Sequence, residues 1–236
     1  MNRESGHAGR GLDRSRRTEA SLRIVLAAAS LALIASCGST SEAADPASDA
    51  PEGRYPSTVP YLAASSYTEA LRAWRTAEDV NAWMGAAFEY DMSRAMALSE
   101  TQRSRNGAPA IARPGDFFAT PRGVCVDLSR FAVETLRALD PQSQPNYLMI
   151  EFAPVSVAGN TLRRHWLATF RREGHRYFFA DSKRPGHLAG PYATIQEFIR
   201  EYEAYRGRRI VAFRELESYE RRVRAMASRQ PRAERP

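Results

Sequence analysis

The segment Gly123–Leu139 constrains the fold most, because its pattern is that of a helix buried on more than one side. Apolar residues recur at helical spacing along one side, and two valines seven residues apart lie on another. The first set is Val124, Leu128, Phe131, Ala132, Thr135, Leu136 and Leu139, and the second is Val126 and Val133. The clear polar edge is made by Arg130, Glu134 and Arg137. We therefore expect a central helix that other elements pack against on several sides.

Cys125 stands directly after a glycine turn, at the first residues of this helical pattern. The first N–H groups of a helix have no partner within it, and the helix dipole adds partial positive charge there. Because this environment favours the thiolate, which attacks carbonyl carbon, we expect Cys125 to be a nucleophile. The structural alternative is a small buried apolar residue. Asp127 is expected to complement the positive end of the helix.

Residues 1–36 have the features of an export signal. The first 23 residues are polar and rich in arginine, and Ile24–Ile34 is an uncharged run too short to span a bilayer comfortably. The run ends in Leu33-Ile-Ala-Ser-Cys37-Gly-Ser, which resembles the lipobox of bacterial lipoproteins. The resemblance implies cleavage before Cys37, lipidation of Cys37 and attachment to the periplasmic or outer face of a membrane. Gly38 favours the outer membrane. The alternative is an ordinary signal peptide with an incidental cysteine.

Composition divides the remaining chain into a tether, a domain and a tail. Residues 37–60 are rich in Ser, Ala, Pro, Asp and Glu, so they bury too little apolar surface to offset their ordering entropy and are predicted to be a disordered tether. One domain is expected over residues 61–228, followed by a disordered tail at 229–236. The net charge is +7, of which residues 1–36 supply +3 through six arginines against three acidic residues. The remaining charge of about +4 is too weak to indicate a nucleic-acid partner.

Short helices are predicted before the cysteine. Ser66 is expected to cap a helix that runs to Arg75, and Thr76-Ala-Glu-Asp79 resembles a capping box that starts a second. A third apolar set runs from Met92 to about Glu100, and Gln102–Gly115 is expected to be a polar loop. The large aromatic residues of this region are expected to be core residues rather than substrate contacts; they are Trp74, Trp83 and Phe88.

Strand patterns follow the central helix. Three strands are expected, the second and third joined by a turn at 171–175, and then a helix, an edge strand and a polar terminal helix. In chain order these are Tyr147–Phe152, Leu162–Phe170, Arg176–Asp181, Tyr192–Tyr205, Arg209–Phe213 and Glu215–Met226.

His165 and Asp181 are the residues expected to complete a site around Cys125. A nucleophilic thiol needs a base within hydrogen-bond reach and a third group that holds the tautomer of the base. If the hairpin pairs symmetrically about Glu173-Gly174, position 165 faces roughly position 182, which leaves Asp181 opposite or one step diagonal. The structural alternatives are a buried histidine and a turn-forming aspartate, and His187 is the second choice for the base. A zinc site lacks the ligand number and spacing.

Three segments together resemble the transglutaminase-like superfamily of papain-type folds: Gly123-Val-Cys125-Val-Asp-Leu-Ser, His165-Trp-Leu-Ala and Tyr177-Phe-Phe-Ala-Asp181. The resemblance covers roughly residues 66–205. It implies an α+β fold, in which a central helix bearing the cysteine packs on a small antiparallel sheet, with additional N-terminal helices. It also implies acyl chemistry at an amide through a thioester. One calcium-dependent branch has acidic residues beside the nucleophile, where this chain has valines, so we expect no calcium.

The expected function is that of a membrane-tethered, cysteine-dependent hydrolase of amide bonds in an envelope protein or peptide. Cys125 attacks, His165 acts as base and then acid, and Asp181 orients His165. No metal or other cofactor is predicted. One oxyanion donor is expected to be the backbone N–H of Cys125, and the other to come from Phe117–Arg122. Two alternatives stay open: a catalytically inactive binding module of the same fold, and a protein-glutamine acyltransferase.

Overall fold

The computed structural model describes residues 48–220 of the 236-residue chain. The predictions for the export signal, for Cys37 and for the tail therefore lie outside the described residues. Within the described range, no helix is both long and apolar enough to cross a membrane.

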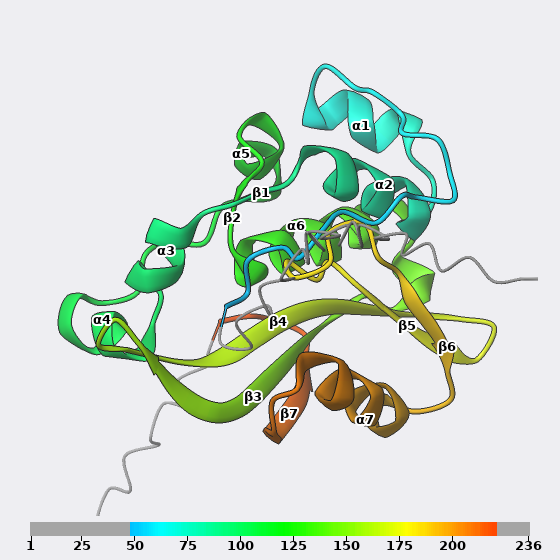
Figure 1. The fold of residues 1–236 in the computed structure, drawn as a ribbon. Coiled ribbons are helices and arrows are strands. Elements are labelled where there is room, and N and C mark those ends of the chain that lie inside the picture. Colours follow the sequence, from blue (N-terminus) through cyan, green and yellow to red (C-terminus); the bar gives the residue numbers. More distant parts are fainter. Residues whose placement is uncertain (1–47, 221–236) are drawn as a thin grey trace, which may run out of the picture. The chain divides into compact units, whose positions relative to one another are not determined.

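A five-stranded antiparallel sheet, in the order β6-β5-β4-β3-β7, forms one layer of the domain (Figure 1). Its strands are β3 (Asn146–Val157), β4 (Asn160–Arg172), β5 (His175–Phe179), β6 (Ala189–Tyr192) and β7 (Ile210–Leu216). Arg172 pairs with His175 across the β4–β5 turn, so the predicted register about Glu173-Gly174 is confirmed. The strand β6 was missed in the sequence, because its four residues include Gly190-Pro191 and lie at an edge of the sheet.

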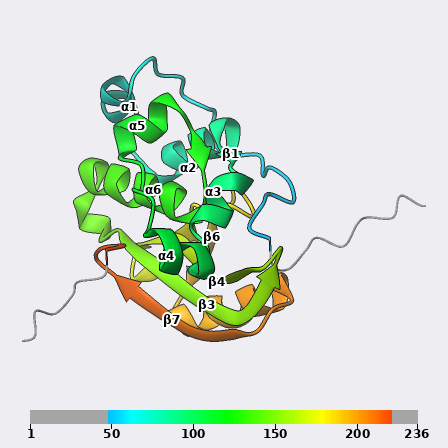
Figure 2. The same cartoon turned by 90° about the vertical axis from the view of Figure 1, so that its left-hand side faces the viewer.

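The predicted central helix is α6 (Cys125–Leu139), and it packs on one face of the sheet. Figure 2 shows the N-terminal helices from a second direction. These are α1 (Tyr67–Ala73), α2 (Ala77–Ala87), α3 (Met92–Ala97), α4 (Glu100–Asn106) and α5 (Pro114–Ala119). On the other side of α6 pack α1, α2 and α5, while α4 packs against β4 and α3 against α4. The opposite face of the sheet is covered by α7 (Ile195–Arg206). The α+β class and the arrangement of the cysteine helix on a small antiparallel sheet are therefore confirmed.

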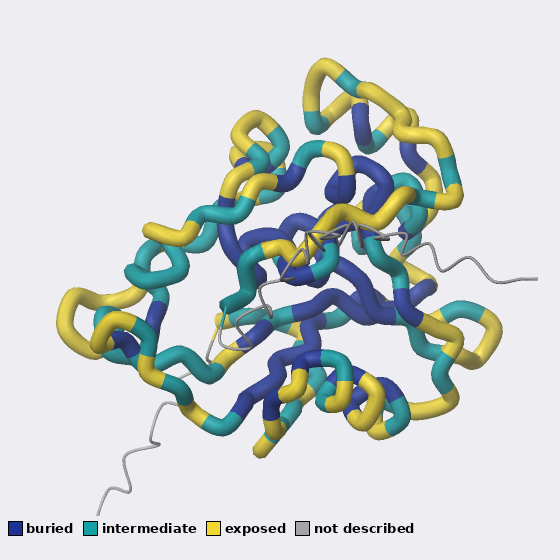
Figure 3. The backbone as a smooth tube through the Cα atoms, viewed as in Figure 1, coloured by how far each residue is buried: buried dark blue, intermediate teal, exposed yellow. Residues whose placement is uncertain are grey.

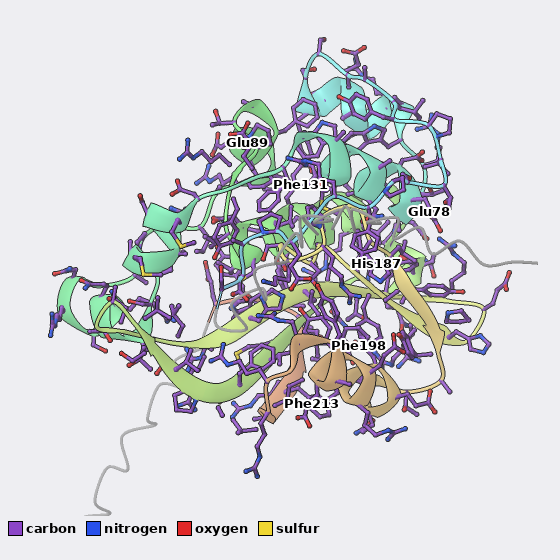
Figure 4. The ribbon with its side chains drawn as sticks, viewed as in Figure 1. Glu78, Glu89, Phe131, His187, Phe198 and Phe213 are labelled. Carbon is purple, nitrogen blue, oxygen red and sulfur yellow. The ribbon has the colours of Figure 1, made fainter. Side chains whose placement is uncertain are left out.

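Alternation along the strands explains why the core has two parts. Ala168 and Phe170 of β4 face α6, whereas Leu167, directly before them, faces α7. Figure 4 labels aromatic residues of both parts, among them Phe131 on α6, whose ring centroid lies 4.7 Å from that of Trp83, and Phe198 on α7. The deepest residues of both parts are dark blue in Figure 3. The prediction that Trp74, Trp83 and Phe88 are core residues is confirmed.

Two predicted segments are corrected. The loop predicted at Gln102–Gly115 is wrong for half of its residues, because α4 includes 102–106 and α5 begins at Pro114, whereas residues 107–113 form a loop as predicted. The polar residues of α4 form a helix because tertiary contacts hold it: the Ser99 hydroxyl caps α4 and contacts Asn160 at 3.1 Å. The terminal helix predicted at Glu215–Met226 is also wrong in its described part, since residues 215–216 end β7 and residues 217–220 have no helix.

Residues 48–55, which we call the strap, are the described part of the predicted tether that contacts the domain most closely; they are the start of the blue chain in Figure 1. They form no helix or strand, but their charged side chains and backbone bond to the domain. A disordered tether is therefore the wrong description of this stretch. Its acidic residues suggested solvation, whereas in the structure they pair with basic residues of the domain.

Candidate active site

The start of α6 is fixed by the buried carboxylate of Asp127. It accepts hydrogen bonds from the backbone N–H of Val124 at 3.1 Å and of Ala112 at 3.0 Å, and it pairs with two nitrogens of Arg94 at 2.7 Å each. Glycine is required at position 123, because a Cβ there would lie 2.9 Å from Asp127 Cβ. The role expected for Asp127 at the helix start fits this geometry, and the network holds Cys125 as the first residue of the helix.

His165 and Asp181 meet beyond the end of the β4–β5 pairing, whose last pair is Ala168 with Phe179. His165 Nε2 lies 3.0 Å from Asp181 Oδ1. The chain turns directly after β5 at Ala180, which adopts a left-handed φ of 60° that non-glycine residues rarely take, and Asp181 follows this turn. That turn directs the carboxylate back toward the ring.

The structure brings the three predicted site residues into one buried region. Cys125 is 7% exposed, His165 is 0% exposed and Asp181 is 4% exposed. The Cys125 Sγ, a His165 ring nitrogen and a carboxylate oxygen of Asp49 all lie within 4.8 Å of one another. His187, the second choice for the base and labelled in Figure 4, instead contacts the Tyr55 ring of the strap in a tilted arrangement, with ring centroids 4.8 Å apart.

Several residues of the site were not predicted. Asp49 Oδ1 lies 3.2 Å from His165 Nδ1 and 2.8 Å from Arg206 Nη2. The Tyr202 hydroxyl donates to Asp181 Oδ2 at 3.0 Å, and the Tyr202 ring stacks on His165. Because Asp49 and α7 are distant in sequence from His165, no local pattern marks them; only the acidic composition of the segment before the domain was visible.

The charges of the site favour a protonated His165 flanked by carboxylates. Burial by itself lowers the pKa of His165, but Tyr202, Asp49 and Asp181 outweigh it and raise that pKa well above 6.5. Burial raises the pKa of Asp49 and Asp181, yet His165 and Arg206 together outweigh it and hold both pKa values below their ordinary range.

The protonation state of the Cys125 thiol differs from the one expected from the sequence. Burial raises the pKa of Cys125, and the charge of Asp49 acts in the same direction, while His165 lowers it without reversing the shift. Desolvation is the largest influence on this pKa, so the thiolate expected at the helix start is not favoured in this conformation.

Asp49, Cys125 and His165 offer oxygen, sulfur and nitrogen donors of the kinds that Zn²⁺ binds. However, the guanidinium of Arg206 lies 2.8 Å from the Asp49 carboxylate. A positive charge beside the donor set disfavours a dication there. We therefore interpret the three side chains as a group that exchanges protons.

An α+β fold with a cysteine at the start of its central helix, beside a histidine and an aspartate carried by the sheet region, is a papain-like core compatible with a cysteine-dependent enzyme. A family model described as a transglutaminase-like domain matches residues 63–210. The match covers more than half of the chain, so the chain belongs to the transglutaminase-like domain family, and the resemblance found over roughly residues 66–205 is confirmed. Comparisons with curated proteins and with solved structures gave no match.

Proposed function

We propose that this protein hydrolyses amide bonds with Cys125 as nucleophile, His165 as base and Asp181 as the residue that orients His165. The observation that carries the proposal is the buried contact of 3.0 Å between His165 Nε2 and Asp181 Oδ1, with Nδ1 on the side of the thiol. A carboxylate at one ring nitrogen fixes the tautomer and leaves the other nitrogen to exchange a proton with the nucleophile.

In the proposed reaction, His165 Nδ1 takes the proton of Cys125 and the sulfur bonds to the carbonyl carbon of an amide. The protonated ring then donates that proton to the leaving nitrogen as the C–N bond breaks, which leaves a thioester on Cys125. A water molecule attacks the thioester while His165 accepts one of its protons. The C–S bond breaks, the acid product leaves, and the proton returns to the sulfur.

Two groups are proposed to stabilise the oxyanion. The backbone N–H of Cys125 is at the first position of α6, where it has no partner within the helix. The second donor is the Tyr90 hydroxyl, in place of a group from Phe117–Arg122. Tyr90 ends β1 (Glu89–Tyr90), which pairs with β2 (Arg122–Gly123) so that Tyr90 is opposite Gly123. Burial is the main cause that raises the pKa of Tyr90, and the charges of Asp49 and Cys125 add to it, which supports a position of its hydroxyl near the thiol.

The test is digestion of envelope proteins by the full chain, followed by sequencing of newly formed N-termini. Cys125→Ala and His165→Ala are expected to abolish the new termini while circular dichroism stays unchanged. If Cys125→Ala yields the same termini, the proposal fails. If no variant, including the wild type, yields termini and Cys125→Ala keeps the cellular phenotype, the inactive binding module is the correct function.

Transfer to an amine is the second candidate reaction, since a thioester accepts an amine as readily in principle as it accepts water. Incubation with a labelled primary amine and envelope extract separates the two. Hydrolysis predicts new carboxyl ends without label. Incorporation of the label at glutamine side chains, lost in Cys125→Ala, identifies a protein-glutamine acyltransferase instead.

The membrane tether is a separate proposal, supported by the sequence Leu33-Ile-Ala-Ser-Cys37. We propose that Cys37 is lipidated and that the domain lies on the periplasmic side of the outer membrane, where it meets envelope substrates. Cell fractionation tests this: the wild type is expected in the membrane fraction, and Cys37→Ser in the soluble fraction. A soluble wild type would refute the anchor and leave the chemistry at Cys125 untouched.

A further inference from the structure

The strap (residues 48–55) is held by the domain as an extended peptide ligand would be. The backbone N–H of Glu52 donates to the carbonyl of Lys183 at 3.1 Å, and that of Tyr55 donates to the carbonyl of Pro185 at 3.0 Å. Main-chain hydrogen bonds from an extended segment are a recurrent mode of peptide recognition. The backbone carbonyls of the loop after β5 therefore bind the backbone N–H groups of the strap.

The domain is shaped for this contact. A Cβ on Gly186 would lie 2.5 Å from the carbonyl oxygen of Tyr55, so only glycine lets the strap approach so closely. The Arg54 guanidinium donates to the carbonyl oxygens of Gly85 at 2.6 Å and of Phe88, at the C-terminus of α2. A cation at that end of a helix is favourable.

Two acidic side chains of the strap meet basic side chains that are themselves buried. Asp49 pairs with Arg206 at 2.8 Å, and Arg206 is 4% exposed. Glu52 pairs with Lys183 at 3.2 Å and accepts a hydrogen bond from the Tyr205 hydroxyl at 2.8 Å. Lys183 is 3% exposed and is the single lysine of the chain. Because buried cations are costly without anions, these are two built carboxylate subsites three residues apart along a peptide.

The same strap lies over the thiol. Asp49 Oδ1 is 3.2 Å from His165 Nδ1, the ring nitrogen that the proposed reaction needs. With Asp49 there, Cys125 is 7% exposed and His165 is 0% exposed, so a substrate carbonyl reaches Sγ only after the strap moves. The strap also precedes residue 63, where the family match begins, so it is an addition to the matched domain.

We propose that the strap is a built-in competitor that occupies the substrate site, and that this site takes extended acidic peptides whose carboxylates are spaced like Asp49 and Glu52. This inference names the substrate class of the proposed function and rests on it for the cleavage step. A substrate carboxylate displaces Asp49 from Arg206, a second displaces Glu52 from Lys183, and the peptide backbone takes over the carbonyls of the loop after β5.

The first experiment measures alkylation of Cys125 by iodoacetamide in the full chain, read at the Cys125 peptide by mass spectrometry. The double variant D49N/E52Q removes both charges without changing side-chain size. Its alkylation is expected to be about tenfold faster or more, because each lost contact is a charge-assisted hydrogen bond. The matched control is D116N/E217Q, which removes two exposed acidic groups outside the strap and is expected to match the wild type. An alkylation rate in D49N/E52Q equal to that of the wild type would overturn the proposal that the strap competes with substrate.

The second experiment adds synthetic peptide to D49N/E52Q and measures protection of Cys125 from alkylation. A peptide with the sequence of residues 47–56 is expected to protect, and the same peptide with Asn and Gln at the two acidic positions is expected to fail. Equal protection by both peptides would overturn the acidic preference. Protection needs no turnover, so protection by the acidic peptide without any cleavage in envelope digests would refute the proposed hydrolase while supporting the recognition site.

The charge swap E52K/K183E keeps the test independent of any local loss of folding. It is expected to restore slow alkylation relative to K183E alone, because the pair is re-formed with opposite sign. If E52K/K183E is alkylated as fast as K183E, the contact between the strap and Lys183 does not hold the strap in place, and the inference fails.

Discussion

His165 has a carboxylate at each ring nitrogen, Asp181 at Nε2 and Asp49 at Nδ1. Burial lowers the pKa of this ring, yet the surrounding groups raise it well above 6.5, so the ring keeps its proton at neutral pH. A base that already holds a proton cannot take one from Cys125. In this conformation the Asp49 carboxylate, and not a Cys125 thiolate, is therefore the anion that pairs with the His165 imidazolium at Nδ1.

Replacing Asp49 with asparagine is expected to lower the pKa of the Cys125 thiol. Burial is the main cause of the raised pKa, but the charge of Asp49 adds to it, and thiolate beside imidazolium is favoured once that charge is gone. The pH profile of alkylation at Cys125 should move to lower pH in Asp49→Asn. A profile that stays in place, or moves to higher pH, would contradict this electrostatic account of the site.

Tyr90→Phe tests the proposed oxyanion donor. Removing one such donor typically lowers kcat by about 100-fold or more, while KM is expected to change little because the substrate carbonyl is bound without it. Kinetics on a cleaved envelope peptide measure both constants. Tyr177→Phe is the control, since Tyr177 stacks on Phe170 away from the thiol. Equal kcat in Tyr90→Phe and wild type would remove Tyr90 from the mechanism.

At the scale of elements, α6 depends on the pairing of Asp127 with Arg94. Asp127→Ala leaves the Arg94 guanidinium without its carboxylate and removes two further hydrogen bonds, from the backbone N–H groups of Val124 and Ala112, so the free energy of unfolding is expected to fall by about 3 kcal/mol or more. Glu134→Ala breaks the more exposed pair with Arg130 on the same helix and is expected to cost about 1 kcal/mol or less. Urea unfolding measures both. Equal losses would show that the helix start is not fixed by Asp127.

Elements with strong local signals were predicted, and elements held by distant contacts were not. The capping box at Thr76 and the register about Glu173-Gly174 follow from local chemistry, and the structure has both. The helix α4 was missed because its polar residues are held by Asn160, at the β3–β4 turn. The limits of β3 extend past the predicted Phe152 because its last residues pair with β4 in a long hairpin.

At the scale of the whole molecule, the site joins segments that are far apart along the chain. Helix chemistry at Cys125 and hairpin symmetry about residues 173–174 pointed to Cys125, His165 and Asp181 from sequence. Asp49 and Arg206, separated by 157 positions, meet over His165 only in the folded chain. Composition described the segment of Asp49 as a tether, since spacing alone does not reveal which basic residue an acidic one will meet.

The charged His165 also predicts how stability depends on pH. A histidine whose folded pKa lies above its unfolded value of 6.5 stabilises the fold fully below pH 6.5, and this contribution is lost as pH rises through the folded pKa. The free energy of unfolding should therefore decline above pH 6.5, by at most about 1.4 kcal/mol per pH unit for one proton. In His165→Gln this decline should be smaller. His187→Gln should keep the wild-type slope, because the pKa of His187 is lowered by burial and Arg184. Identical slopes in all three proteins would contradict a protonated His165.

Detection of the acyl-enzyme tests the central claim most directly. The full chain is incubated with envelope peptides, quenched in acid and mapped by mass spectrometry. The account predicts an acyl group on Cys125 that hydroxylamine removes, and its absence in Cys125→Ala and His165→Ala. Cleavage of the peptides with no acyl group on Cys125, at an undiminished rate in Cys125→Ala, would contradict it.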